Sequence, residues 1–154
     1  MPVSDRRLEM MKVARPQYQA MLALEQSITL DRSLEHLVKV RASQINGCAY
    51  CLDMHWKDAR AGGEPEDRLY ALGAWEESPL YSERERAALG LCEAMTLIAG
   101  SHVPDAVWDR ATTHFDPEEL AQLVFAIAAI NTWNRLAITV REPPGTYRPT
   151  VKEA

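Results

Sequence analysis

The sequence predicts an all-α fold, a compact bundle of about six to seven helices that forms a single domain over residues 1–154. Apolar residues recur at spacings of three and four, as on one face of a helix. Residues that begin or end helices stand between these segments, and no convincing stretch alternates apolar and polar residues as a half-buried strand does. A chain of 154 residues, 47% of them hydrophobic, is long enough to bury a core without disulfides.

Three predicted helices occupy the first part of the chain. Pro16 suits the first turn of one helix. Asp31 or Ser33 can cap a second, in which apolar residues recur at helical spacing. The dipeptide Asn46-Gly47 interrupts this pattern. A third helix is therefore expected to begin at Cys48 and to end near the next Gly-Gly pair.

Four further helices are predicted in the second part. Pro65 and Pro104 can each open a helix, and Ser82 with Glu85 forms a capping-box sequence that introduces a helix up to Gly100. The last helix starts after Asp116, runs to about residue 140 and is apolar on most of its circumference. Such a helix lies at the centre of a core or against another subunit, so the bundle is expected to oligomerise. The core covers about residues 16–140, and residues 141–154 are expected to form an extended C-terminal arm.

Composition and charge exclude several classes of protein. The net charge of −5, with acids and bases mixed along the chain, argues against nucleic acid as a partner. The charged segment from Met1 to Met11 lacks the apolar centre of a signal peptide. The apolar run from Leu120 to Ile130 is too short to cross a bilayer. We therefore expect a cytoplasmic protein with no membrane partner, whose three cysteines are reduced rather than a disulfide framework.

Two of the cysteines and a histidine share one predicted helix face. Cys48, Cys51 and His55 are separated by three, four and seven residues, which places their side chains within about two turns of one another. The start of a helix favours a thiolate, and a neighbouring histidine can accept a thiol proton or stabilise the charged sulfur. Two sulfurs at this spacing can also close a disulfide, so that one attacks a peroxide or disulfide and the other resolves the product.

Other interpretations of these residues are open. A zinc site needs four ligands, whereas Cys48, Cys51 and His55 supply three. Covalent haem attachment requires a histidine directly after the second cysteine, where Leu52 stands. The two cysteines can also be small core residues with a hydrogen-bonded histidine nearby. Cys92 lies on the apolar face of its helix and is expected to be a core residue.

Three segments together resemble a known family. The segment from Leu37 to His55, which contains Ser-Gln-Ile-Asn-Gly-Cys-Ala-Tyr-Cys, closely resembles the core motif of the alkylhydroperoxidase D-like family, within the carboxymuconolactone decarboxylase superfamily. The resemblance continues at Tyr81-Ser-Glu-Arg-Glu-Arg-Ala-Ala and at Ile130-Asn-Thr-Trp-Asn-Arg135. It implies an all-α fold, a trimeric or hexameric homo-oligomer, and thiol-dependent reduction of hydroperoxides.

The resemblance also implies roles for site residues. It assigns Cys51 as the sulfur that attacks peroxide and Cys48 as the sulfur that resolves it, whereas the helix-start argument alone favours Cys48 as the more acidic thiol. Family members carry a glutamate of a proton relay twelve residues before the first cysteine, and here that position is His36. His36 can carry a proton itself or be a surface residue. Glu35 is about 100° away on the helix and is expected to point elsewhere.

A second polar group lies in the last helix. Asn131 and Arg135 are four residues apart and share a face, while Trp133 points elsewhere. We expect this group, which includes Asn134, to satisfy buried polar atoms and to pack a subunit contact rather than to touch substrate.

Three function classes follow. The favoured one is a hydroperoxide-reducing or disulfide-reducing enzyme that has no bound cofactor and is recycled by an external thiol donor. The family resemblance implies that the donor is a lipoyl-bearing protein. The second is a lactone decarboxylase, which has no need of the thiol pair. The third is an oligomeric protein whose thiols sense oxidants without turnover.

Overall fold

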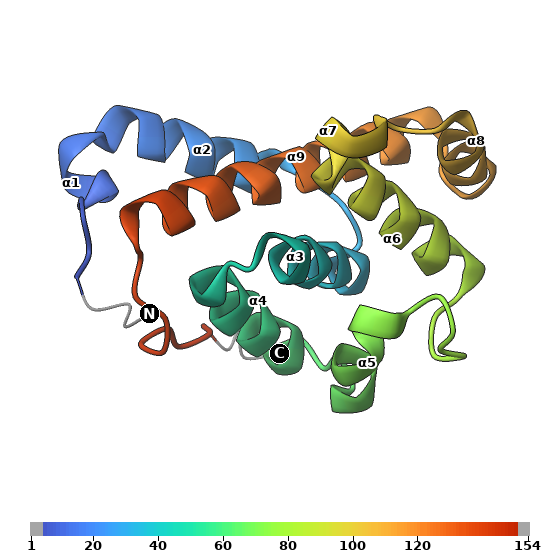
Figure 1. Cartoon of the computed structure of the whole chain (residues 1–154), viewed down its shortest axis with the longest axis horizontal. Helices are drawn as coiled ribbons and strands as arrows, with labels where there is room; N and C mark the ends of the chain where they lie inside the picture. The colour runs from blue at the N-terminus through green and yellow to red at the C-terminus, as the bar shows by residue number, and fades with distance from the viewer. Residues whose placement is uncertain (1–4, 151–154) are drawn as a thin grey trace.

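The computed structural model describes residues 5–150, which form α-helices and one short 3-10 helix and contain no strand (Figure 1). The all-α prediction is thus confirmed for these residues. The four residues at each end, which belong to the charged N-terminal segment and the predicted arm, lie outside the described residues. The elements are α1 (Met10–Val13), α2 (Arg15–Ser27), α3 (Arg32–Asn46), α4 (Ala49–Ala61), α5 (Glu66–Ala71), η1 (Leu72–Ala74), α6 (Glu83–Thr96), α7 (Ile98–Ser101), α8 (Asp105–His114) and α9 (Pro117–Val140).

The seven predicted helices all form, with differences at their ends. The helix expected to begin at Cys48 starts one residue later, with Cys48 as its N-cap. The helix expected to continue to Gly100 ends at Thr96, and the short α7 follows it. The predicted fourth helix ends in the 3-10 turn η1. The single turn α1 was not predicted, because four residues carry too little periodicity to detect.

Side chains at the helix starts explain where several helices begin. The Asp31 carboxylate accepts a hydrogen bond from the Leu34 amide at 3.0 Å, so Asp31 rather than Ser33 caps α3. The Ser82–Glu85 capping box forms as predicted. Asp116 and Glu119 make a second capping box, at the start of α9.

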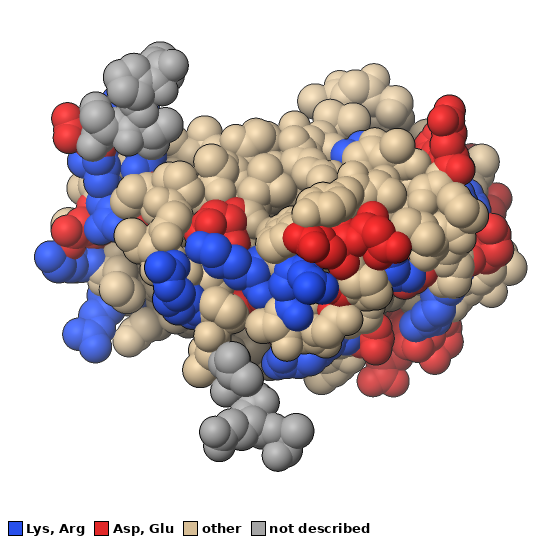
Figure 2. Space-filling view, turned by 90° about the horizontal axis from the view of Figure 1, so that it is seen from below, with Lys and Arg blue, Asp and Glu red and all other residues tan. Residues whose placement is uncertain are grey.

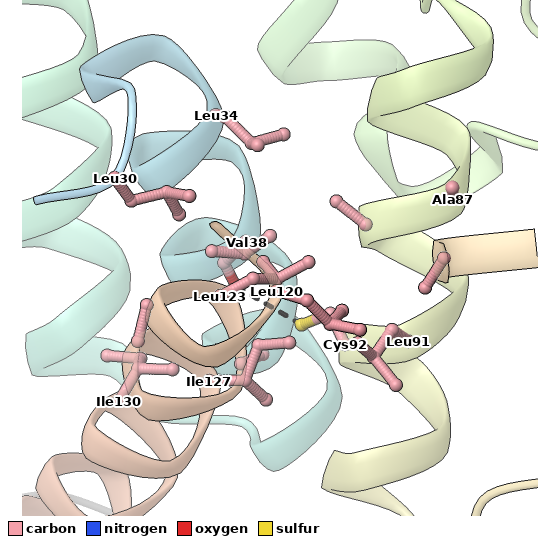
Figure 3. Close-up of a cluster of buried hydrophobic side chains, with 14 of the residues drawn as sticks. Leu30, Leu34, Val38, Ala87, Leu91, Cys92, Leu120, Leu123, Ile127 and Ile130 are labelled. Carbon is pink, nitrogen blue, oxygen red and sulfur yellow. Dashed lines mark hydrogen bonds between the residues drawn. The ribbon is translucent and has the colours of Figure 1, made fainter. Parts of the chain in front are cut away.

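Helix α3 lies at the centre of the molecule and packs against α4, α6 and α9 (Figure 1). Figure 3 shows the largest cluster of buried apolar side chains, in which α3 meets α6 and α9. Cys92 is fully buried in this cluster, and its thiol donates a hydrogen bond to the Val38 carbonyl at 3.4 Å. The prediction that Cys92 is a core residue is confirmed.

Helix α9 is the long core helix that the apolar pattern predicts. Leu123, Ile127 and Ile130 on its inner face are completely buried, whereas Phe125 on its outer face is 54% exposed. By length and composition alone, its 24 residues are enough to cross a membrane, because the helix extends well beyond the apolar run considered in the sequence. Its buried inner face identifies it as a core helix of this bundle.

The two ends of the described chain lie against the same part of the bundle. The Arg7 amide donates to the Val140 carbonyl, and Arg6 forms an ion pair with Glu142. Residues 141–150 form no helix or strand, and they lie beside α4, where the Tyr147 hydroxyl donates a hydrogen bond to Asp58. The Gly145 amide donates to Asp53 there. These contacts close one side of the cavity described below.

We expect Leu123→Ala to lower the free energy of unfolding by about 2–5 kcal/mol, because it leaves a cavity in the cluster around α9. Phe125→Ala, two residues away on the exposed face, is the matched control and should change it by about 0.5 kcal/mol or less. Urea denaturation measures both values. Equal losses for the two variants would contradict the assignment of the inner and outer faces of α9.

Candidate active site

The thiol pair is held at the junction of α3 and α4. Gly47 ends α3 with φ at +67°, in the left-handed region that glycine adopts without strain. The next residue, Cys48, caps α4, and its Sγ accepts a hydrogen bond from the Cys51 amide at 3.4 Å. The Sγ atoms of Cys48 and Cys51 are 2.7 Å apart, and both residues are only 1% exposed. Two free thiols therefore lie within reach of a disulfide bond of about 2.05 Å.

The two thiols have opposite acidities. The hydrogen bond between the Cys48 and Cys51 sulfurs is the largest influence that lowers the pKa of Cys48 to about 7. The same contact raises the pKa of Cys51, and burial raises it further. When the pair loses one proton, the negative charge is thus centred on Cys48 and is stabilised by the proton that stays on Cys51.

A cavity of about 1080 Å³ lies beside the pair, between α2, α3, α4, α9 and the C-terminal arm. Cys51 lines this cavity, whereas Cys48 does not. The aromatic part of the wall comes from four elements far apart in the sequence, through Tyr18, Tyr50, Trp133 and Tyr147. A small molecule that enters the cavity meets the sulfur of Cys51 first.

His55 and His36 both line the same cavity. His55 is 7% exposed, and burial lowers its pKa to about 3, with a smaller contribution from the charge of Lys39. Burial also lowers the pKa of His36. Each imidazole has one buried nitrogen without a hydrogen-bond partner among the described residues, Nε2 of His55 and Nδ1 of His36. Both rings are neutral at pH 7, and each has a nitrogen available for a proton or a substrate.

The position of His36 depends on a glycine. A methyl group at Gly62 would lie 3.3 Å from His36 Nε2, which is tighter than an ordinary van der Waals contact. The structure thus places His36 in the cavity wall, between α3 and the end of α4, rather than on the outer surface. Glu35 also lines the cavity, but its carboxylate binds Lys39 at 2.6 Å.

The sequence interpretation missed a buried charged cluster in the cavity wall. Lys39 is 7% exposed and forms ion pairs with Glu35 and with Glu25 of α2. Trp133 Nε1 donates to the second oxygen of Glu25 at 3.2 Å, and the Trp133 ring meets Tyr18 edge to face. These contacts attach α2, which has no fully buried residue, to α3 and α9. The sequence signal that could have revealed this cluster was Lys39, a lysine among the buried apolar positions of α3.

Amides support the turn before Cys48. The Asn46 side chain donates to Asn131 and Asn134, and Asn134 donates to the Ser43 hydroxyl at 3.0 Å. Asn134 is completely buried, and its amide is also one of the groups that lower the pKa of Cys48. The prediction that these residues satisfy buried polar atoms is confirmed, although Trp133 lines the cavity. Whether this helix also packs a subunit contact stays a prediction.

The remaining interpretations of the motif concern metals. Within residues 5–150, no three side chains of histidine, cysteine, aspartate or glutamate are grouped so that they could hold a metal ion. Cys51 and His55, one turn apart on α4, both line the cavity, but His55 makes no hydrogen bond to either sulfur in this part of the chain.

Comparisons with known proteins agree with the resemblance. The model of the carboxymuconolactone decarboxylase family matches residues 17–94. The chain is 47% identical over 112 residues to the uncharacterised protein YdfG of Bacillus subtilis (strain 168). This aligned region covers 73% of this chain and 76% of YdfG. It is 33% identical over 102 residues to the uncharacterised protein YnjA of Escherichia coli (strain K12). This aligned region covers 66% of this chain and 56% of YnjA.

Solved structures agree as well. ATU0492 of Agrobacterium tumefaciens, a protein of unknown function whose name suggests an AhpD role in antioxidant defence, is 41% identical, with a TM-score of 0.89. The match covers 93% of this chain and all of ATU0492. The debrominase Bmp8 has a TM-score of 0.79 at 19% identity over 88% of this chain and 75% of Bmp8, which shows a shared fold alone. The chain belongs to the carboxymuconolactone decarboxylase family, as an alkylhydroperoxidase D-like member.

Proposed function

We propose that this protein is a thiol-dependent peroxidase that reduces hydroperoxides with the Cys48–Cys51 pair. The observation that carries the proposal is the arrangement of the two sulfurs. Cys51 lines a cavity large enough for an organic hydroperoxide, and the Cys48 sulfur, which does not line the cavity, lies 2.7 Å from the Cys51 sulfur. This is the order that an attacking and a resolving thiol require.

The first step uses the proton shared by the pair. Transfer of the Cys51 proton to Cys48 across 2.7 Å moves the negative charge to the sulfur that faces the cavity. The Cys51 thiolate attacks the terminal oxygen of the hydroperoxide, and the O–O bond breaks. Cys51 becomes a sulfenic acid, and the departing alkoxide takes a proton to leave as an alcohol. The two-electron reduction of the peroxide is balanced by oxidation of Cys51.

The second step closes the disulfide. Cys48 attacks the Cys51 sulfenic acid, water leaves, and an S–S bond forms. An external dithiol then reduces this disulfide by thiol–disulfide exchange and is itself oxidised to a disulfide. No bound cofactor is needed in either step. A donor of the lipoyl type, as the family resemblance implies, fits this chemistry.

His55 and His36 are the proposed proton carriers. Because burial keeps His55 neutral, it acts as a base or as a neutral donor to the leaving oxygen, and not as a permanent cation beside the thiolate. His36 stands at the position of the family's relay glutamate and lines the same cavity. A neutral imidazole can accept a proton on one nitrogen while it donates from the other, so His36 can replace a carboxylate in a relay.

Two other functions use the same residues differently. An oxidant sensor would carry out the first two steps without efficient recycling, and a disulfide reductase would take a disulfide in place of a peroxide. A lactone decarboxylase would leave the thiol pair without a role. The assays below separate these functions, because sustained peroxide turnover requires both sulfurs and a reductant.

We predict that Cys51→Ser abolishes peroxide consumption in the presence of dithiothreitol. Cys48→Ser should allow a single round, which leaves a sulfenic acid on Cys51 that dimedone traps and mass spectrometry locates. His36→Ala should slow turnover by about 100-fold or more, the usual contribution of a proton carrier. Full peroxide consumption by Cys51→Ser would overturn the mechanism, and a dimedone adduct on Cys48 in the unaltered protein would reverse the two roles.

We predict that the most reactive thiol titrates at about pH 7, measured by the rate of iodoacetamide alkylation at different pH values. Cys51→Ala removes the hydrogen bond that stabilises the Cys48 thiolate, so the pKa of Cys48 should rise. Cys92→Ala serves as the control, because this buried thiol lies in the core and not at the pair. If the titration of the reactive thiol were unchanged in Cys51→Ala, the contact between the two sulfurs would not be the cause of the low pKa of Cys48.

We predict that burial of neutral His55 makes the protein sensitive to acid. Below about pH 6.5 the unfolded chain protonates this histidine, while the folded protein keeps it neutral down to about pH 3. The free energy of unfolding therefore falls by about 1.4 kcal/mol per pH unit for this proton as the pH decreases through that range. In chemical denaturation at several pH values, His55→Gln should reduce the slope of unfolding free energy against pH by the contribution of one proton. A slope unchanged in His55→Gln would be evidence against a buried neutral ring.

A further inference from the structure

Asn134 is a polar residue on the inner, apolar face of α9. It follows Ile127 and Ile130 at spacings of seven and four residues, so the three side chains share one face of the helix. Both isoleucines pack in the same buried cluster as Cys48 and Cys51. Asn134 is 0% exposed. Its amide is therefore held among the side chains that surround the thiol pair and is shielded from solvent.

Hydrogen bonds determine which way the Asn134 amide points. The Ile127 carbonyl can only accept, and Asn131 Nδ2 donates to it at 3.0 Å, so the Asn131 oxygen faces Asn46. Asn46 must then be the donor, to Asn131 Oδ1 at 2.9 Å and to Asn134 Oδ1 at 2.8 Å. The Asn134 oxygen therefore faces Asn46, and its amide nitrogen points to the other side.

The Asn134 nitrogen carries two N–H groups, and one of them has no oxygen or nitrogen acceptor within residues 5–150. The other donates to Ser43 Oγ at 3.0 Å, because the Ser43 hydroxyl itself donates to the Lys39 carbonyl at 2.7 Å. A buried N–H without an acceptor is costly, which leaves the sulfurs as its partners. Hydrogen bonding by Asn134 contributes to the low pKa of Cys48 and opposes the rise in the pKa of Cys51.

Neutral donors, rather than cations, surround the thiol pair. Figure 2 shows lysine and arginine side chains on the outer surface of the molecule, whereas Cys48 and Cys51 are each 1% exposed. The buried ammonium group of Lys39 is compensated by its ion pairs with Glu25 and Glu35. None of the largest influences on the pKa of Cys48 is a cation. A charged sulfur at this pair therefore depends on N–H donors.

We propose that Asn134 is a catalytic residue whose amide N–H donates to the charged sulfur of the pair, Cys48 at rest and Cys51 during attack. This inference rests on the proposed function, because it concerns the charge that moves between the sulfurs in the first step. A donor that reaches both sulfurs stabilises the charge before and after the proton crosses from Cys51 to Cys48. The amide gives up no proton, so the balance of the reaction is unchanged.

The ultraviolet absorbance of the thiolate, followed between about pH 5 and pH 9, tests the donor. Burial raises the pKa of Cys92 to about 12, so this thiol stays protonated in that range. Asn134→Leu removes the amide, and we expect the acid dissociation constant of the pair to fall about tenfold, the effect of one hydrogen bond to a charged group. Asn131→Leu is the matched control, because the Asn131 amide donates to Thr96 and to the Ile127 carbonyl. It should leave the constant within about twofold.

The rate of disulfide formation with diamide separates a hydrogen-bond donor from a residue that only shapes the turn. At about pH 9.5 the pair is ionised with or without the donor, so Asn134→Leu should form the disulfide within about twofold of the unaltered rate. At about pH 7 the variant should be about fivefold slower, because less thiolate is present. Asn134→Ala, which cannot overfill the site, should change the acid dissociation constant in the same direction.

Three results would overturn the role of Asn134. They are an unchanged acid dissociation constant in Asn134→Leu, an equal change in Asn131→Leu, and slow disulfide formation at both pH values, which would mean that the sulfurs had moved apart. Neither measurement uses peroxide. A failure of the proposed peroxidase reaction would therefore appear in the turnover assay alone and would not be mistaken for the loss of the donor.

Discussion

The contact between the Cys48 and Cys51 sulfurs is the interaction on which the site depends, and a single turn of backbone creates it. Gly47 adopts the left-handed conformation that ends α3, and the chain then re-enters a helix with Cys48 as its cap. Capping directs the first sulfur back toward the amide and the side chain of Cys51. The acidity of Cys48 follows from that direction, since the largest influence on its pKa is the thiol of Cys51. A residue with a side chain at Gly47 would strain this turn.

The site also depends on ionisable groups that are held away from water. Neutral His55 and charged Lys39 are both buried in the wall of one cavity, and each responds to burial in its own way. His55 loses its proton because it has no charged partner, whereas Lys39 keeps its charge because Glu25 and Glu35 flank it. Burial of a paired lysine contributes little net stability. The role of Lys39 is therefore to hold α2 in position and to place a positive charge in the cavity wall. The ammonium group opposes protonation of His55 and links α2 to the core.

Sequence patterns predicted the parts of this protein that local physics determines. Helix spacing and capping residues were sufficient for the seven main helices and for the place of Cys51 and His55 on the helix that starts after Cys48. They were not sufficient for the contacts between distant segments. Glu25 meets Lys39, and Trp133 meets Glu25, only because α2, α3 and α9 pack together. The end of the helix after Ser82 was also misplaced, since nothing in the local pattern marks the break at Leu97.

The reacting residues are close together in the sequence, whereas the residues that line the cavity come from distant segments. The family model matches residues 17–94, which include both sulfurs and both cavity histidines. Part of the cavity wall, including Tyr18 and Tyr50, lies within the match too, and another part comes from segments beyond it, with Trp133 on α9 and Tyr147 on the arm. Tyr147 donates to Asp58 at 2.7 Å, so the arm is fastened to the helix that carries Cys51 and His55. The shape that a substrate meets is thus set partly by residues outside the matched segment, while the thiol chemistry is set within it. A chain can therefore keep the Cys-x-x-Cys motif and its acidity and still differ from its relatives in what reaches the sulfur.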